Sequence, residues 1–193
     1  TKTYRLSFKF LDIGSHIRSE KNVYKVAEPK IQELADASGE LVHLVVEEDG
    51  KGVYLCRAKG EHAVDLDTYV GCRHHMHSTA FGKAILSHLS TERVDEIIDQ
   101  HGLPAVTTQT ITARDELLEE LEQTRERGFA VDDEERLAGL RCIAAPIRFD
   151  SDVIGAISIS GPTARIDDTW ESNEFVNQLC RVANVIELNK YRV

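Results

Sequence analysis

The chain has 193 residues, 41% of them hydrophobic, and carries a formal net charge of −10 at pH 7. The length predicts one domain of about 150 residues with a flanking element, or a single large domain, and the acidic balance argues against nucleic-acid binding by this chain alone, because the phosphate backbone needs a basic face. No apolar run reaches the roughly 18 residues of a membrane span and no signal-peptide core opens the chain, so we expect a cytoplasmic protein without membrane contact.

The N-terminal segment has the pattern of an amphipathic helix. Its apolar residues recur at helical spacing at Leu6, Phe10, Ile13 and Ile17. No cap or strand precedes this helix in the sequence. We therefore interpret residues 1–21 as a linker from an absent N-terminal module and residues 22–193 as the domain itself.

A second helix is predicted over residues 23–38, with Gly39 in the place of a left-handed C-cap. Pro29 is expected to kink this helix or to divide it. Alternating residues on both sides of the turn Asp49-Gly50-Lys51-Gly52 predict a β-hairpin. A short strand is expected to follow around residues 63–69.

The second half of the chain also contains both helical and strand patterns. Ser78 or Thr79, and then Ser90, are suitable helix N-caps. The predicted helices cover residues 79–88, a segment after Ser90, and 112–127; strands follow over 129–133, 142–149 and 153–161, with a last helix over 168–191. Strands joined by tight turns pair antiparallel and need helices to cover them, so the predicted fold class is α+β, with a central antiparallel sheet flanked by helices.

The stretch from Ala130 to Pro162 concentrates the candidate functional groups. Ser158 and Ser160 are two residues apart in one strand, so both hydroxyls face the same side. Asp132 and Cys142 are expected just outside the strand ends, where loops carry functional groups. Apolar walls with a few converging hydroxyl, thiol and carboxyl groups indicate a small-molecule pocket.

Several segments in order are similar to one known family. They are Tyr4-Arg5-Leu6 with Leu11-Asp12-Ile13-Gly14, His77-Ser78-Thr79-Ala80-Phe81-Gly82-Lys83-Ala84-Ile85-Leu86, Arg127 to Glu135, Gly139-Leu140-Arg141-Cys142-Ile143-Ala144-Ala145-Pro146, and Ile157-Ser158-Ile159-Ser160-Gly161-Pro162. Over nearly the whole chain they resemble the C-terminal effector-binding domain of IclR-type transcription regulators. The resemblance implies a GAF/profilin-like domain that binds a small organic or aromatic acid and forms a homodimer or tetramer. It implies no enzyme and no cofactor, and DNA as a partner only through an N-terminal winged helix-turn-helix.

The resemblance also assigns the pocket residues. The family's positions carry over to Leu66, His74, Ala80, Phe81, Asp132, Leu140, Cys142, Ser158 and Ser160. Free N–H groups at the helix start over residues 79–82 would suit an anion, and Gly82 would let the backbone approach a ligand. Phe81 replaces a smaller residue of the family pattern, which favours an aromatic or planar ligand.

Three alternatives stay open. One is a metal-binding sensor at His74, His75 and His77, which would need a further ligand such as Cys142, Asp132 or His43. Another is a thiol-dependent enzyme that uses Cys142 with a nearby histidine, although the four cysteines are otherwise expected to be reduced and without disulfides. A third is an assembly module without a ligand, whose apolar residues Phe8, Phe10 and Leu11 form a dimer contact.

Overall fold

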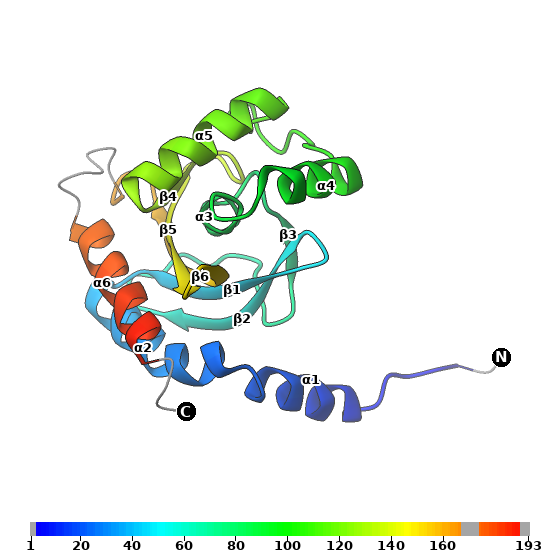
Figure 1. The fold of residues 1–193 in the computed structure, drawn as a ribbon. Coiled ribbons are helices and arrows are strands. Elements are labelled where there is room, and N and C mark those ends of the chain that lie inside the picture. The colour runs from blue at the N-terminus through cyan, green and yellow to red at the C-terminus, as the bar shows by residue number, and fades with distance from the viewer. Residues whose placement is uncertain (1–2, 167–173, 190–193) are drawn as a thin grey trace.

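The computed structural model describes residues 3–166 and 174–189. Its centre is a curled six-stranded sheet in which every strand pairs antiparallel with its neighbours (Figure 1). The strand order is β3-β2-β1-β6-β5-β4, so β3 and β4 are the edges. The strands are β1 (Leu41–Glu48), β2 (Lys51–Lys59), β3 (Arg73–His75), β4 (Ala130–Asp133), β5 (Leu140–Phe149) and β6 (Asp152–Pro162).

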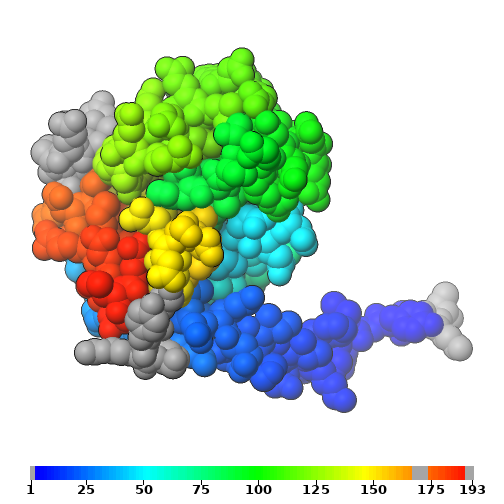
Figure 2. Space-filling model, in the orientation of Figure 1, coloured from blue at the N-terminus to red at the C-terminus, as the bar shows by residue number. Residues whose placement is uncertain are grey.

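Helices cover both faces of this sheet (Figure 1). One face packs against α2 (Asn22–Ser38) and α6 (Glu174–Leu188). The other face packs against α3 (Ala80–Leu86), which is covered in turn by α4 (Thr91–His101) and α5 (Arg114–Arg127). The first helix, α1 (Lys9–Ser19), extends away from the body as an arm, which the space-filling view in Figure 2 shows clearly.

The strand sequences divide the interior into two apolar cores. Along β6, Ile157 and Ile159 point to the face under α2 and α6, where large aliphatic side chains fill the core. Ala156 lies in the other core, against α3. Because side chains alternate along a strand, Ser158 and Ser160 also face α3. From Ala156 to Ser160, the α3 side of this strand therefore carries only small side chains.

The predicted fold class is confirmed, and so are most element positions. Gly39 ends α2 at φ 74°, a left-handed conformation that glycine adopts without strain. The first hairpin forms as expected, and Ser90 caps α4 by accepting a hydrogen bond from the N–H of Arg93. No described helix has the length and apolar character needed to cross a membrane. All four cysteines are free thiols.

Four local predictions were wrong. Residues 63–69 form no strand, because Arg57 takes the carbonyls of Leu66 and Thr68 as hydrogen-bond acceptors. Pro29 lies inside α2, which continues through it, so the expected division of the helix was wrong. Asp132 and Cys142 lie within β4 and β5, and not beyond the strand ends. The helices expected over 79–88 and 112–127 are shorter. The ends of the last predicted helix, residues 168–173 and 190–191, lie outside the described residues.

Candidate functional site

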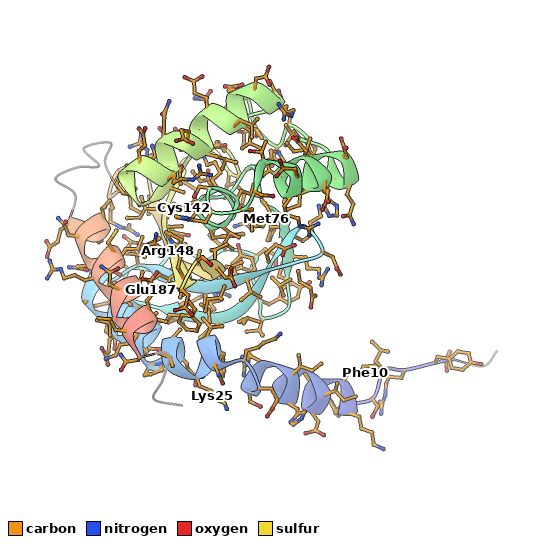
Figure 3. All side chains as sticks on the ribbon, viewed as in Figure 1. Phe10, Lys25, Met76, Cys142, Arg148 and Glu187 are labelled. Atoms are coloured by element: carbon orange, nitrogen blue, oxygen red, sulfur yellow. The ribbon has the colours of Figure 1, made fainter. Side chains whose placement is uncertain are left out.

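A cluster of buried polar side chains lies on the α3-facing side of the sheet. In one row across the sheet, Ser160 of β6 pairs with Cys142 of β5, which pairs with Asp132 of β4. In the next row, Ser158 of β6 pairs with His43 of β1. All five side chains are at most 6% exposed. We call these five residues the polar cluster. Figure 3 labels Cys142, and also Met76, close to α3 on the inner side of the curled sheet.

Aromatic rings pack at the side of the polar cluster where β2 and β3 lie. The ring of Tyr54 is 4.7 Å from that of His43, 5.3 Å from Phe81 and 5.5 Å from His74, each in an edge-on arrangement. Edge-on packing of this kind is favourable for aromatic rings. A ring system therefore adjoins the buried hydroxyl, thiol and carboxyl groups.

The nine residues assigned to the pocket lie on this side of the sheet. Asp132, Cys142 and Ser160 are neighbours in one row, and Ser158 lies in the next. Ala80, Phe81 and Leu140 belong to the same buried core as Cys142, Leu66 packs at the edge of that core, and His74 contacts Tyr54. Their common location is an observation; their role in ligand binding stays a prediction.

Asp132 is the most unusual group of the cluster. Its Oδ1 accepts the backbone N–H of Glu135 at 2.9 Å and of Arg136 at 3.2 Å, whereas its buried Oδ2 has no hydrogen-bond partner in the described structure. Burial raises the pKa of Asp132 to about 6, against the charge of Lys83 and the two N–H donors, which lower it. A buried acceptor without a partner costs free energy, so a ligand that donates to Oδ2 would be stabilised.

Two histidines, His43 of the polar cluster and His74 of β3, are neutral. Burial, with a smaller effect from nearby arginines, lowers the pKa of His43 to about 3 and that of His74 to about 4. Nε2 of His43 forms a hydrogen bond with the buried hydroxyl of Thr68 at 3.1 Å. The site therefore offers neutral imidazoles, which can donate or accept according to tautomer.

The thiol of Cys142 is poorly suited to nucleophilic catalysis. Burial and the neighbouring charge of Asp132 raise its pKa far above the usual range, so the thiol stays protonated near neutral pH. The reactive form of cysteine is the thiolate. The burial of Cys142 therefore argues against the thiol-dependent enzyme.

The three histidines predicted as metal ligands do not come together at one point. His74 contacts Tyr54, whereas the rings of His75 and His77 lie 5.5 Å apart and that of His75 also faces His101. Nε2 of His77 lies 3.2 Å from the carbonyl of Pro104. Within residues 3–166 and 174–189, no group of three or more His, Cys, Asp or Glu side chains is arranged to hold a metal ion.

The reason for Gly82 differs from the one expected. A Cβ at this position would lie 2.0 Å from the carbonyl oxygen of Met76. The hydroxyl of Thr79 donates to the carbonyls of His75 at 3.0 Å and Met76 at 3.3 Å instead of capping α3. Gly82 therefore accommodates the backbone of the preceding loop, where we had expected it to let its own backbone approach a ligand.

A buried ion pair lies next to the polar cluster and was missed by sequence reasoning. Lys83 of α3 is 2% exposed and pairs with Glu135, and its Nζ is also 3.6 Å from Glu120 of α5. Burial raises the pKa of Glu135 to about 7, while Lys83 lowers it. Charged residues are rarely buried without a partner, but the pairing of residues 52 positions apart left no local signal.

Tyr54, Arg57 and Arg136 were also missed. The only sequence feature that could have pointed to them was His43, a polar residue inside an apolar strand. Because β1 and β2 form a hairpin, their register places Arg57 opposite His43. A β-bulge between Leu44 and Val45 shifts that register, so counting back from the turn would have misplaced the pair.

The sequence and the fold of this chain are similar to those of known proteins. The family model described as "Bacterial transcriptional regulator IclR C-terminal" matches residues 16–188. The transcriptional repressor IclR of Escherichia coli K12 is 35% identical over 180 residues, which cover 91% of this chain and 65% of that protein. The chain thus spans just under two thirds of this relative's length.

Solved structures of proteins from this family have a similar fold. The IclR structure of Thermotoga maritima superposes with a TM-score of 0.87 at 30% identity, covering 95% of this chain and 74% of that one. An IclR homologue of Microbacterium hydrocarbonoxydans in complex with 4-hydroxybenzoate superposes with a TM-score of 0.85 at 25% identity, covering 98% of this chain and 76% of that one. The curated relatives are named as transcription regulators and repressors, which supports the prediction that the chain is not an enzyme. The chain belongs to the IclR family of bacterial transcription regulators, whose C-terminal domain it matches.

Proposed function

We propose that the domain binds a small organic or aromatic acid at the polar cluster and thereby changes the DNA affinity of an attached winged helix-turn-helix in a cytoplasmic homodimer or tetramer. The observation that carries the proposal is the buried, unpartnered Oδ2 of Asp132 beside the Ser160–Cys142 row. Hydroxyl groups of Ser158 and Ser160 can donate to a carboxylate or carbonyl oxygen. The ligand would supply the donor that Asp132 lacks.

Two structural relatives support an acidic aromatic ligand. The Microbacterium homologue holds 4-hydroxybenzoate, and an inducer-binding domain of PobR from Acinetobacter, a double mutant, holds 3-hydroxybenzoic acid. In the present chain, Tyr54, Phe81 and His43 supply aromatic faces and edges beside the polar groups. Residues 1–21, including α1, would act as the linker to the DNA-binding module.

Coupling to DNA binding requires two arrangements of the protomers. A ligand shifts their balance only by the difference between its affinities for the two arrangements. Binding at the cluster would change the relative placement of the attached DNA-binding modules and so the affinity for the operator.

A thermal-shift screen tests the proposal. A ligand at 100 times its dissociation constant adds about 2.7 kcal/mol of stability, which raises the melting temperature of a domain of this size by several degrees. The panel holds small carboxylates, keto acids, aromatic acids and divalent metals. We expect an acid to stabilise the wild-type domain.

The double variant Ser158→Ala/Ser160→Ala identifies the site. It removes both hydroxyls from β6 and should abolish the shift while the far-UV circular dichroism stays that of the wild type. Ser151→Ala, at an exposed serine in the turn between β5 and β6, is the matched control. An unchanged shift in the double variant would refute the site, and a response to zinc alone that is lost in His74→Ala/His75→Ala would favour the metal sensor.

A further inference from the structure

Arg136 connects the two edges of the curled sheet. It follows β4, one edge strand, and its Nη2 lies 3.2 Å from Nε2 of His74 in β3, the other edge strand. Its positive charge also reaches into the polar cluster, where it favours the deprotonated forms of Asp132, His43 and Cys142. Arg136 therefore lies at the cluster although it comes from a loop that the sequence motifs did not single out.

The backbone of this loop is firmly anchored. Oδ1 of Asp132 accepts the N–H groups of Glu135 and Arg136. The carbonyl of Glu135 accepts the hydroxyl of Thr110 at 2.7 Å, and the side chain of Glu135 pairs with Lys83. The Cα of Arg136 is thus fixed, and the position of its guanidinium depends on its side-chain torsions alone.

His74 is a weak partner for this guanidinium. Arginine donates only, so Nε2 of His74 must be the unprotonated acceptor. The thiol of Cys72 lies 3.3 Å from the same nitrogen, so two donors compete for one lone pair. Within the described residues, Arg136 forms no ion pair with a carboxylate, although it is half-buried. A bidentate carboxylate would satisfy this guanidinium better, because charge-assisted hydrogen bonds are roughly twice as strong as neutral ones.

The surroundings favour an anion at this point. Arg57 reaches the same face, where it lies opposite His43, and its buried Nε has no hydrogen-bond partner in the described structure. His43 and His74 are neutral and add no negative charge. Asp132 is the carboxylate of the polar cluster, and its Oδ2 can still accept a hydrogen bond from a ligand.

We propose that Arg136 binds the carboxylate of the effector in exchange for His74, and that the effector is a small monocarboxylate whose other end donates a hydrogen bond to Oδ2 of Asp132. This inference rests on the proposed function and names the class of ligand for that site. Arg136 thereby determines specificity for acids over neutral analogues. The exchange also releases the hydrogen bond between His74 of β3 and the loop after β4.

The experiment compares acids with their neutral carboxamides by isothermal titration calorimetry. The probes are 3-hydroxybenzoate, 4-hydroxybenzoate, glycolate and lactate, each beside its amide, titrated into the wild type and three variants. Arg136→Gln removes the charge, and Arg136→Lys keeps the charge without the planar fork. Arg73→Gln is the matched control, because Arg73 is an exposed arginine on β3, next to His74, that pairs with Glu48.

We expect the wild type to bind at least one acid and to reject its amide. Arg136→Gln should lower the affinity for that acid about 10- to 100-fold, the range expected for a hydrogen-bonded charged group, and should leave the amide unaffected. The affinity of Arg136→Lys for the acid should lie between those of the wild type and Arg136→Gln. Arg73→Gln should change the affinity by about twofold or less, since exposed charges are screened.

Two results would overturn the inference. Equal affinity of Arg136→Gln and wild type for the acid would remove Arg136 from the site while leaving the proposed function standing. Failure of the wild type to bind any of these hydroxy acids would reject the ligand class. In that case the wider acid screen with the Ser158→Ala/Ser160→Ala variant decides separately whether the proposed function holds.

Discussion

Single residues in the polar cluster hold unfavourable positions that packing alone does not explain. Asp132 is 1% exposed, keeps one oxygen without a partner and has a raised pKa. Glu135, three residues later, also has a raised pKa and a buried oxygen without a partner. Buried polar atoms are nearly always satisfied in stable proteins. Two neighbouring carboxylates that each keep one buried oxygen without a partner are what the proposed ligand site would explain.

The raised pKa of Asp132 predicts how stability changes with pH. Its pKa rises from an ordinary 3.8 to about 6 on folding, so between pH 4 and 6 the folded state holds a proton that the unfolded state has lost. Stability from this group is therefore full below pH 4 and is lost as the pH rises through 6, by up to about 3 kcal/mol. Asp132→Asn should flatten this slope, measured as the urea midpoint at pH 4, 5, 6 and 7.

The variant Glu119→Gln is the control for that measurement, because it removes an exposed carboxylate of α5. Part of the slope should persist in Asp132→Asn, since Glu135 titrates near pH 7. Identical slopes in Asp132→Asn and wild type would show that Asp132 does not carry the raised pKa.

At the scale of elements, α3 is held by its neighbours more than by its own sequence. It has seven residues, all of them buried, and its N-cap residue makes no side-chain capping bond. Short helices are marginal in isolation. The loop before α3 packs its Met76 carbonyl against Gly82, and Lys83 ties the helix to the loop after β4. Both contacts fix Ala80 and Phe81 over the polar cluster.

Gly82→Ala should therefore destabilise the domain. The added Cβ would meet the backbone of Met76 at 2.0 Å, and backbone cannot move aside as a flexible side chain does. We expect a loss of about 1–3 kcal/mol and weaker ligand binding, measured by urea denaturation and by thermal shift. Gly14→Ala in α1 is the matched control: its Cβ would meet nothing within 4 Å, so the loss should be absent. A fully stable Gly82→Ala would contradict the close packing of this loop.

The elements also show what the sequence could and could not predict. Periodicity and caps located α2, α4 and the first hairpin, because these features act over a few residues. The segment 63–69 was assigned wrongly, because a distant arginine, Arg57, occupies its carbonyls. The spacing of Ser158 and Ser160 predicted that they share one face of β6, and their register in the sheet agrees. Arg136 and Lys83 were not, because their partners lie on edges and helices that only the folded sheet brings together.

At the scale of the whole molecule, the arm formed by α1 is the part that the domain does not bury. None of its residues is buried. Even its apolar side chains are 53–67% exposed, namely those of Phe10, Leu11, Ile13 and Ile17. An open groove of about 1000 Å³ runs between this arm and the sheet. Its lining includes Phe10 and Ile17 on one side and Phe149, Val153 and Ile154 on the other. Figure 3 places Phe10 on the arm, away from Cys142.

An exposed apolar surface of this kind is typical of a contact between chains. The proposed homodimer or tetramer would cover it, which gives the last prediction. Phe10→Ser/Ile17→Ser should weaken self-association about 100-fold, because burying each apolar side chain contributes about 1.5 kcal/mol or more. Light scattering after size-exclusion chromatography should show the mass falling toward the 21.6 kDa of one chain. Acid binding should persist, since the arm lies outside the polar cluster. Asp12→Asn, at an exposed polar position of α1 outside the groove lining, should keep the wild-type mass. An unchanged mass in Phe10→Ser/Ile17→Ser would place the contact between chains on another surface.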